Sequence, residues 1–342
     1  MPRPRSAVPV LAALLLAPAA VCAQQPATHD LPLVPANIHW GFFDAKQAPI
    51  VRIRSGDRVR VETMVARGLE RPRLAGLRDQ DFDAREIAVE AAVMERGPGP
   101  HPMTGPIWVE GAEAGDVLEV RLEEIRALST WGVSGFLPGG GTIPDRFPYG
   151  EIRLFQIDTL AGFARMTTTG SRIPLAPFFG TIGVAPPVLT GRVTTTAPGA
   201  FTGNIDNKDL VAGTTLYVPV LVQGALLSIG DGHAAQGDGE VSGTAIETSL
   251  RGTVRVILHK GTGRRWPWAE TPTHWMSMGL HTDLDEAAKL AVSEMVDFLV
   301  REKGMSAADA YILCSAALDL RVTQLVDGTK GIHGLLAKSV VP

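Results

Sequence analysis

Cysteine is scarce in this sequence, with two residues, Cys22 and Cys314, among 342. Cys22 belongs to an N-terminal leader that we expect to be removed, so the mature chain would keep Cys314 alone. A single cysteine forms no intramolecular disulfide, which excludes a disulfide-stabilised scaffold. Cys314 follows the apolar residues 311–313, which favours a buried, unreactive thiol over a nucleophile.

Long hydrophobic runs are also missing. The apolar run Leu11–Ala20 has ten residues, whereas a membrane-spanning helix needs about 20. Arg3 and Arg5 precede this run and the small-residue end Val21-Cys22-Ala23 follows it, which is the three-part pattern of a secretory signal. We therefore expect a signal peptide at residues 1–23, export to the periplasm or the medium, and no stable membrane insertion after cleavage; a retained anchor is the alternative.

Excess positive charge is absent as well. The formal charge is −4, and removal of the two leader arginines would lower it to about −6. No run of basic residues with interleaved aromatic residues is present. The sequence therefore argues against nucleic acid or an anionic membrane as a partner.

Two common catalytic motifs do not occur. Gly139-Gly140-Gly141 lacks the Lys-Ser/Thr pair of a phosphate-binding loop, so a turn or a flexible lid is the better interpretation. The Gly-x-Ser-x-Gly motif of serine hydrolases is missing too, and Ser134 and Ser228 have no pattern that marks a nucleophile.

Short strand-like stretches, separated by glycine and proline, dominate the chain as far as about residue 281. The clearest are Val51–Arg54, Val59–Glu62, Val117–Ile125, Leu216–Val222 and Thr248–His259. Such spacing predicts a mainly β fold with sandwich or barrel packing instead of a βαβ sheet. Residues 24–342 are expected to form one catalytic domain that begins with a loose segment at 24–35.

A helical hairpin is predicted at residues 283–325. Apolar residues recur in steps of three and four from Leu284 to Leu299, with a cap at residue 282 or 283 and Gly304 as the end. Ser306 with Asp309 marks the start of the second helix. We expect the pair to pack against the sheet.

The chemistry is predicted to lie between residues 204 and 240, where polar residues gather among glycines on either side of an apolar strand. Residues two apart in an extended segment face the same side, which would pair Asp231 with His233, Asn204 with Asp206, and Asp238 with Glu240. Carboxylates with an imidazole suit zinc or a similar divalent ion, which polarises a carbonyl and activates water. A solvated Gly/Asp turn cluster is the alternative, since no standard zinc spacing is present. The candidates are Asn204, Asp206, Asp231, His233, Gln236, Asp238 and Glu240, with His101 as a further residue that reaches the metal or the substrate.

These residues belong to a longer recognisable pattern. The segments are Gly203–Leu210, Gly213–Val220, Gly224–Leu226 and Gly230–Glu240, with Met103–Pro106, Val109–Ala112, Gly115–Leu118 and Ile182–Pro186. In this pattern the chain resembles the acetamidase/formamidase family, from about Ile38 to Ile332.

The resemblance implies a mainly β fold with an α+β portion, in which small amides are hydrolysed to carboxylate and ammonia. It also implies a bound divalent metal ion, often zinc, and homo-oligomers. Carried onto this chain, it makes Asp206 and His233 the preferred metal ligands and Glu240 the general base. Asn204, Asp231, Gln236 and Asp238 would complete or orient the site.

The leader and residues 38–44 and 134–146 depart from the family's usual pattern, which leaves the substrate open. A hydrolase of a cyclic amide (lactam) or another small carbonyl compound is the second hypothesis. A non-catalytic, extracytoplasmic protein that binds a small ligand on the same fold is the third.

Overall fold

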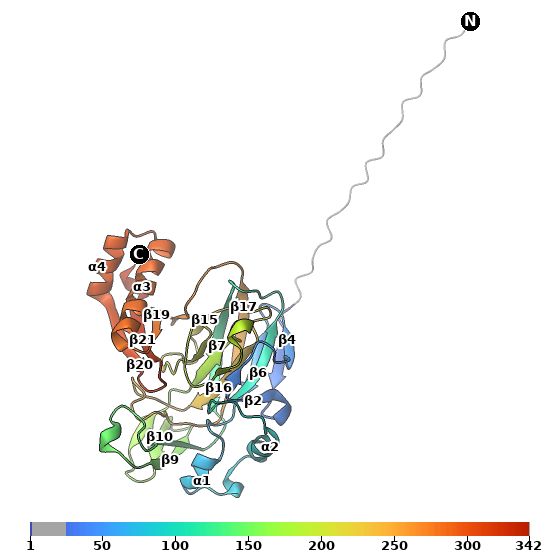
Figure 1. Ribbon diagram of the computed structural model, residues 1–342, viewed down its shortest axis with the longest axis vertical. Coiled ribbons are helices and arrows are strands. Elements are labelled where there is room, and N and C mark those ends of the chain that lie inside the picture. The colour runs from blue at the N-terminus through green and yellow to red at the C-terminus, as the bar shows by residue number, and fades with distance from the viewer. Residues whose placement is uncertain (2–24, 342) are drawn as a thin grey trace.

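The computed structural model describes residue 1 and residues 25–341, and in this part the chain is mainly β (Figure 1). The predicted signal peptide lies outside the described residues, apart from Met1. Among residues 25–341 the largest sheet has nine strands. In spatial order they are β1 (Thr28–Leu31), β5 (Arg58–Glu62), β17 (Leu250–His259), β7 (Val117–Ala127), β15 (Thr215–Pro219), β18 (Trp268–Glu270), β19 (His274–His281), β21 (Lys330–Ala337) and β20 (Leu318–Gln324).

A second sheet has six strands in the described part of the chain. Its order is β14 (Thr202–Asn204), β12 (Phe178–Gly183), β16 (Leu227–His233), β6 (Pro102–Val109) and β2 (Ile38–Trp40), with β4 (Val51–Ile53) parallel to β6. Smaller sheets are formed by β8 (Trp131–Phe136), β9 (Glu151–Asp158), β10 (Phe163–Met166) and β11 (Arg172–Pro174), and by β3 (Phe42–Phe43) with β13 (Val193–Thr194).

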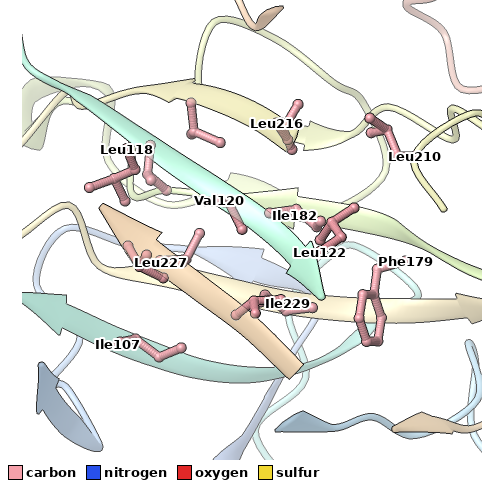
Figure 2. Packing of buried hydrophobic residues seen from close by; sticks show 14 of the residues in the cluster. Ile107, Leu118, Val120, Leu122, Phe179, Ile182, Leu210, Leu216, Leu227 and Ile229 are labelled. Carbon is pink, nitrogen blue, oxygen red and sulfur yellow. The ribbon is translucent and has the colours of Figure 1, made fainter. Parts of the chain in front are cut away.

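The main core lies between the two large sheets. Apolar side chains of β7 and β15 meet those of β6, β12 and β16, as the packing of Val120, Ile182 and Ile229 illustrates (Figure 2). Alternate residues of β17 are buried, as the period of two predicted, whereas β7 begins with four consecutive buried residues, Val117–Val120. The packing is that of a β-sandwich, and the strand orders of residues 25–341 close no barrel.

The C-terminal helices α3 (Leu284–Lys303) and α4 (Ala307–Ala317) pack against β19 and β21, at the end of the molecule opposite β9 and β10 (Figure 1). The Asp283 side chain caps α3, Gly304 ends it with a φ of 70°, and Ser306 caps α4. Cys314 is buried on α4.

The helical hairpin is shorter than predicted. It ends at Ala317, not near residue 325, because Leu318–Thr323 alternates apolar and polar residues and joins β21 as the edge strand β20.

Two N-terminal segments also differ from the prediction. The segment expected to be loose contains β1, which pairs in parallel with β5. The region expected to be β-rich contains the short helices α1 (Glu70–Leu74) and α2 (Ala84–Ala92). A capping box between Asp83 and Glu86 starts α2, and this Asp-x-x-Glu spacing was the overlooked signal. No helix in the described part of the chain is long and apolar enough to span a membrane.

Candidate functional site

Strand β12 organises the candidate site, because it pairs with both β14 and β16. Thr181 of β12 lies opposite Asn204 of β14 and Gly230 of β16, and Phe178 lies opposite His233. Side chains from two segments far apart in the sequence, near residues 204 and 231, are thereby brought over the same short stretch of β12.

Gly180 of β12 leaves the space in which these side chains meet. A Cβ atom at this position would lie 2.5 Å from Asp206 Oδ1 and from Asp231 Oδ2, and 2.6 Å from His233 Cε1. Such distances are far inside van der Waals contact, so the absence of a side chain at Gly180 is required for the cluster to form.

Two of the three predicted pairs are confirmed in the structure. His233 Nε2 lies 3.3 Å from Asp231 Oδ1, and Asn204 Nδ2 donates to Asp206 Oδ2 at 2.7 Å. Asp206 and His233 also converge, because Asp206 Oδ1 lies 3.9 Å from His233 Nδ1. All four residues are buried.

The two ring nitrogens of His233 have different surroundings. Nε2 faces carboxylates, with Asp231 Oδ1 at 3.3 Å and Glu247 Oε2 at 3.2 Å. Nδ1 faces Asp206, and neither Nδ1 nor Asp206 Oδ1 has a hydrogen-bond partner although both atoms are buried. Unpaired buried polar atoms are costly, so this pair of atoms is suited to a ligand that the protein alone does not supply.

Negative charge is in excess at this cluster. Asp206, Asp231, Glu240 and Glu247 are buried, and Asp327 is partly buried beside them. Two triads in the described part of the chain offer ligand atoms within 4.8 Å of one another: Asp206, His233 and Glu240, and Asp231, His233 and Glu247.

The crowding raises the pKa values of three of these carboxyl groups. Burial raises the pKa of Asp206 well above its usual range, and the neighbouring charges of Glu240 and Asp231 add to this. Burial likewise raises the pKa of Glu240, with the charge of Asp327 next in importance. Asp327 has its pKa raised to about 6, chiefly by burial. The protein alone therefore does not stabilise all of these carboxylates in their ionised forms.

Asp231 and His233 form the opposite case. Burial would raise the pKa of Asp231, but the charges of His101 and His233 outweigh it and hold the pKa below the usual range. Burial would lower the pKa of His233, but the carboxylates of Glu247 and Asp231 raise it well above its usual value. The Asp231–His233 pair is thus electrostatically matched.

The backbone is strained at three of the acidic residues. The φ angles are 47° for Asp206, 59° for Asp231 and 43° for Glu240, all in the left-handed region. Non-glycine residues adopt this region at a cost of about 1–3 kcal/mol each, and they do so mostly at functional sites.

The remaining predicted residues divide into two groups. His101 Nε2 lies 3.7 Å from Asp231 Oδ2, and Gln236 Nε2 donates to the Asp206 backbone carbonyl at 2.7 Å, so both belong to the site. Asp238 does not, because its side chain is exposed and pairs with Lys208 at 3.1 Å. The expected pairing of Asp238 with Glu240 on one face is wrong: Gly239 has a φ of 89° and breaks the extended conformation.

Several residues of the site were not predicted. Thr181 donates to Asn204 Oδ1 at 2.5 Å, and Asp327 accepts from Asn204 Nδ2 at 3.1 Å. The backbone of Glu247 forms an isolated β-bridge with that of His233, which brings the two side chains together. Arg71 of α1 is half-buried. Burial, followed by the charge of Arg67, lowers its pKa to about 10, whereas the charges of Glu247 and Glu240 oppose this shift and so connect Arg71 electrostatically to the cluster. No local sequence signal marks these residues, because tertiary contacts bring them in.

The fold and the cluster define a class: mainly β proteins with a buried site of carboxylates and histidine. Comparison with known proteins makes the class specific. The family model described as the acetamidase/formamidase family matches residues 45–191 and 187–336. The chain belongs to this family, and this confirms the resemblance found in the sequence.

Individual relatives agree with this result. The formamidase of Methylophilus methylotrophus is 28% identical over 249 residues, which cover 56% of this chain and 57% of that protein. The chain thus matches little more than half the length of this curated relative. The solved acetamidase of Bacillus halodurans superposes with a TM-score of 0.75 at 33% identity, over 91% of this chain and 98% of that one. The acetamidase structure from Yersinia enterocolitica gives a TM-score of 0.79 at 28% identity, over 94% of each chain.

Proposed function

We propose that this chain hydrolyses a small, uncharged linear amide to a carboxylate and ammonia. The observation that carries the proposal is the convergence of Asp206, His233 and Glu240, the first two directly over Gly180, in a chain that belongs to the acetamidase/formamidase family. Relatives named formamidase and acetamidase, of similar sequence and fold, support it.

We further propose that a divalent cation, zinc in the first instance, completes the site. The residues fit such an ion: negative charge is in excess, and Asp206 Oδ1 and His233 Nδ1 are buried without partners. Asp206 and His233 would hold the ion through these two atoms. When bound, the ion would supply Lewis acidity toward the amide carbonyl and toward a water molecule.

The protein's own groups would then position and move protons. Asp231 and Glu247 face His233 Nε2, so they fix the ring and leave Nδ1 turned toward Asp206. Glu240 lies in the same triad as Asp206 and His233. A carboxylate there would accept a proton from the attacking water and pass it to the leaving nitrogen, so that one C–N bond breaks as one C–O bond forms.

Metal analysis and ammonia release from a panel of amides test this function. We expect a bound divalent ion, loss of activity after chelation and recovery with zinc. Glu240→Gln should lower the rate about 10²–10⁴-fold, whereas Asp238→Asn, the matched control at an exposed position, should not. Ammonia release that survives complete removal of metal would refute the role of the ion.

The same panel separates the rival functions. Preferential turnover of lactams would favour a cyclic substrate. A pure binding protein would release no ammonia from any amide, and its Glu240→Gln variant would keep nearly normal affinity for the amide it binds.

We also propose that the chain is exported, with the leader removed after Ala23, and that it forms a homo-oligomer. N-terminal sequencing of the extracytoplasmic fraction tests the first point. Light scattering during size-exclusion chromatography tests the second.

A further inference from the structure

A second cavity lies away from the candidate site, between the nine-stranded sheet and α3. Its volume is about 370 Å³, and Tyr217, Trp268, Trp275 and Phe298 contribute aromatic walls. We call it the aromatic cavity. None of the residues that line it belongs to the acid–histidine cluster described above, so its chemistry is independent of amide hydrolysis.

The aromatic walls form a broad apolar surface. The ring of Phe298 on α3 lies 4.6 Å from the ring of Trp268 and 5.2 Å from that of Trp275, measured between centroids. Trp268 is buried, whereas Trp275 is only partly buried and so keeps exposed ring surface. Surfaces of this kind favour a flat, apolar ligand body.

Two of the three acidic side chains that line the cavity are already paired. Glu270 accepts from Tyr217 Oη and from Lys338 Nζ, both at 2.7 Å. Glu119 is bonded by Arg121 and by His259 Nε2. These two carboxylates are therefore not available to bind a cationic ligand.

Arg264 is different, because no carboxylate in the described part of the chain forms an ion pair with it, although the charge of Glu294 acts on it from farther away. The guanidinium lies 4.9 Å from the centre of the Trp268 ring, and its Nη1 atom is buried without a hydrogen-bond partner. Glu302 also lines the cavity, and its charge acts on Arg264, but no ion pair joins the two residues in the described part of the chain. A buried, unpaired guanidinium nitrogen is costly, and an anionic acceptor would satisfy it.

We propose that the aromatic cavity binds a small molecule that carries a flat apolar body and a carboxylate. The rings of Trp268, Trp275 and Phe298 receive the apolar body, and Arg264 Nη1 donates to the carboxylate.

Binding of benzoate, compared with the neutral benzyl alcohol of similar size, tests the proposal on the full chain. Titration calorimetry and saturation-transfer NMR should show saturable benzoate binding that is about tenfold or more tighter than binding of benzyl alcohol, since a hydrogen bond to a charged group contributes about 1.5–3 kcal/mol. Arg264→Gln should remove this preference. Arg265→Gln, at the exposed neighbouring residue outside the cavity lining, should retain it.

Two further variants keep the test decisive. Trp275→Leu, at a partly exposed position, should weaken benzoate and benzyl alcohol alike, and it serves if Arg264→Gln does not fold. The proposal is overturned by absence of saturable benzoate binding, by equal affinity for the two probes, or by binding that Asp206→Asn abolishes and Arg264→Gln leaves intact. A change of oligomeric state in Arg264→Gln without benzoate binding also overturns it, because the occupant would then be a second copy of this chain.

Discussion

The contact between Gly180 and the acid–histidine cluster leads to a quantitative prediction for Gly180→Ala. The new Cβ atom would lie 2.5 Å from the carboxylate oxygens of Asp206 and Asp231, and ordinary contact begins at 3.4 Å. The carboxylates would have to retreat by about 0.9 Å, and a misplacement of about 1 Å lowers catalytic rates about 100-fold. We therefore expect at least this loss of amidase rate, together with loss of bound metal.

The cost in folding stability should be moderate. Overpacking by one methyl group lowers the free energy of unfolding by about 1–3 kcal/mol, and Gly180 carries no positive φ that would add strain. Amide hydrolysis, metal content and thermal unfolding should all be measured on the same preparation. The variant should be folded but inactive.

A matched control separates local crowding from general destabilisation. Gly334→Ala on β21 also introduces a tight contact, 2.8 Å from Ser277 Oγ and 3.0 Å from a Leu318 methyl carbon, but away from the cluster. It should lose some stability and retain its rate and metal. Wild-type rate and metal content in Gly180→Ala would refute the reasoning, because the cluster would then not depend on the empty space above Gly180.

Two further predictions concern stability. Burial lowers the pKa of His39 from 6.5 to about 4, so between these pH values the unfolded chain binds a proton that the folded protein does not bind. The stability contributed by neutral His39 should therefore be fully present above pH 6.5 and fall by about 3 kcal/mol toward pH 4. In denaturant titrations, His39→Gln should show a flatter pH dependence of the unfolding free energy. Asp283→Ala removes the side-chain cap of α3 and should lower the unfolding free energy by about 1 kcal/mol at neutral pH; an unchanged urea midpoint would show that the cap contributes nothing.

Local periodicity predicted the parts of the site that lie on regular strands. Asp231 and His233 stand two apart on β16, and a period of two was enough to place them together. The same rule was wrong for Asp238 and Glu240, because a left-handed Gly239 lies between them and turns Asp238 into the solvent. In the confirmed pair the intervening Gly232 has no left-handed φ, although Asp231 itself does, so the conformation of the residue between two side chains decides whether the spacing holds.

For the fold as a whole, local patterns likewise predicted single strands and helices but not how these elements are arranged. Alternating apolar residues predicted β5, β7 and β17, and the steps of three and four predicted the buried face of α3. The order of strands within the sheets was beyond reach, since it depends on pairings between distant segments. Glu247 and Asp327 belong to this second category, because only the assembled sheets bring them beside residues 204–233.

The strained backbone and the crowded charge at the site have a common consequence. Asp206, Asp231 and Glu240 all adopt left-handed φ angles, and burial raises the pKa values of Asp206 and Glu240. Each feature alone destabilises the folded chain, and both occur where these carboxylates crowd around His233. A bound cation would relieve the repulsion but not the backbone strain. The free energy that holds these φ angles must therefore come from the packing around them: Asp231 lies on β16, and Asp206 and Glu240 lie in connections outside the strands that are nevertheless buried.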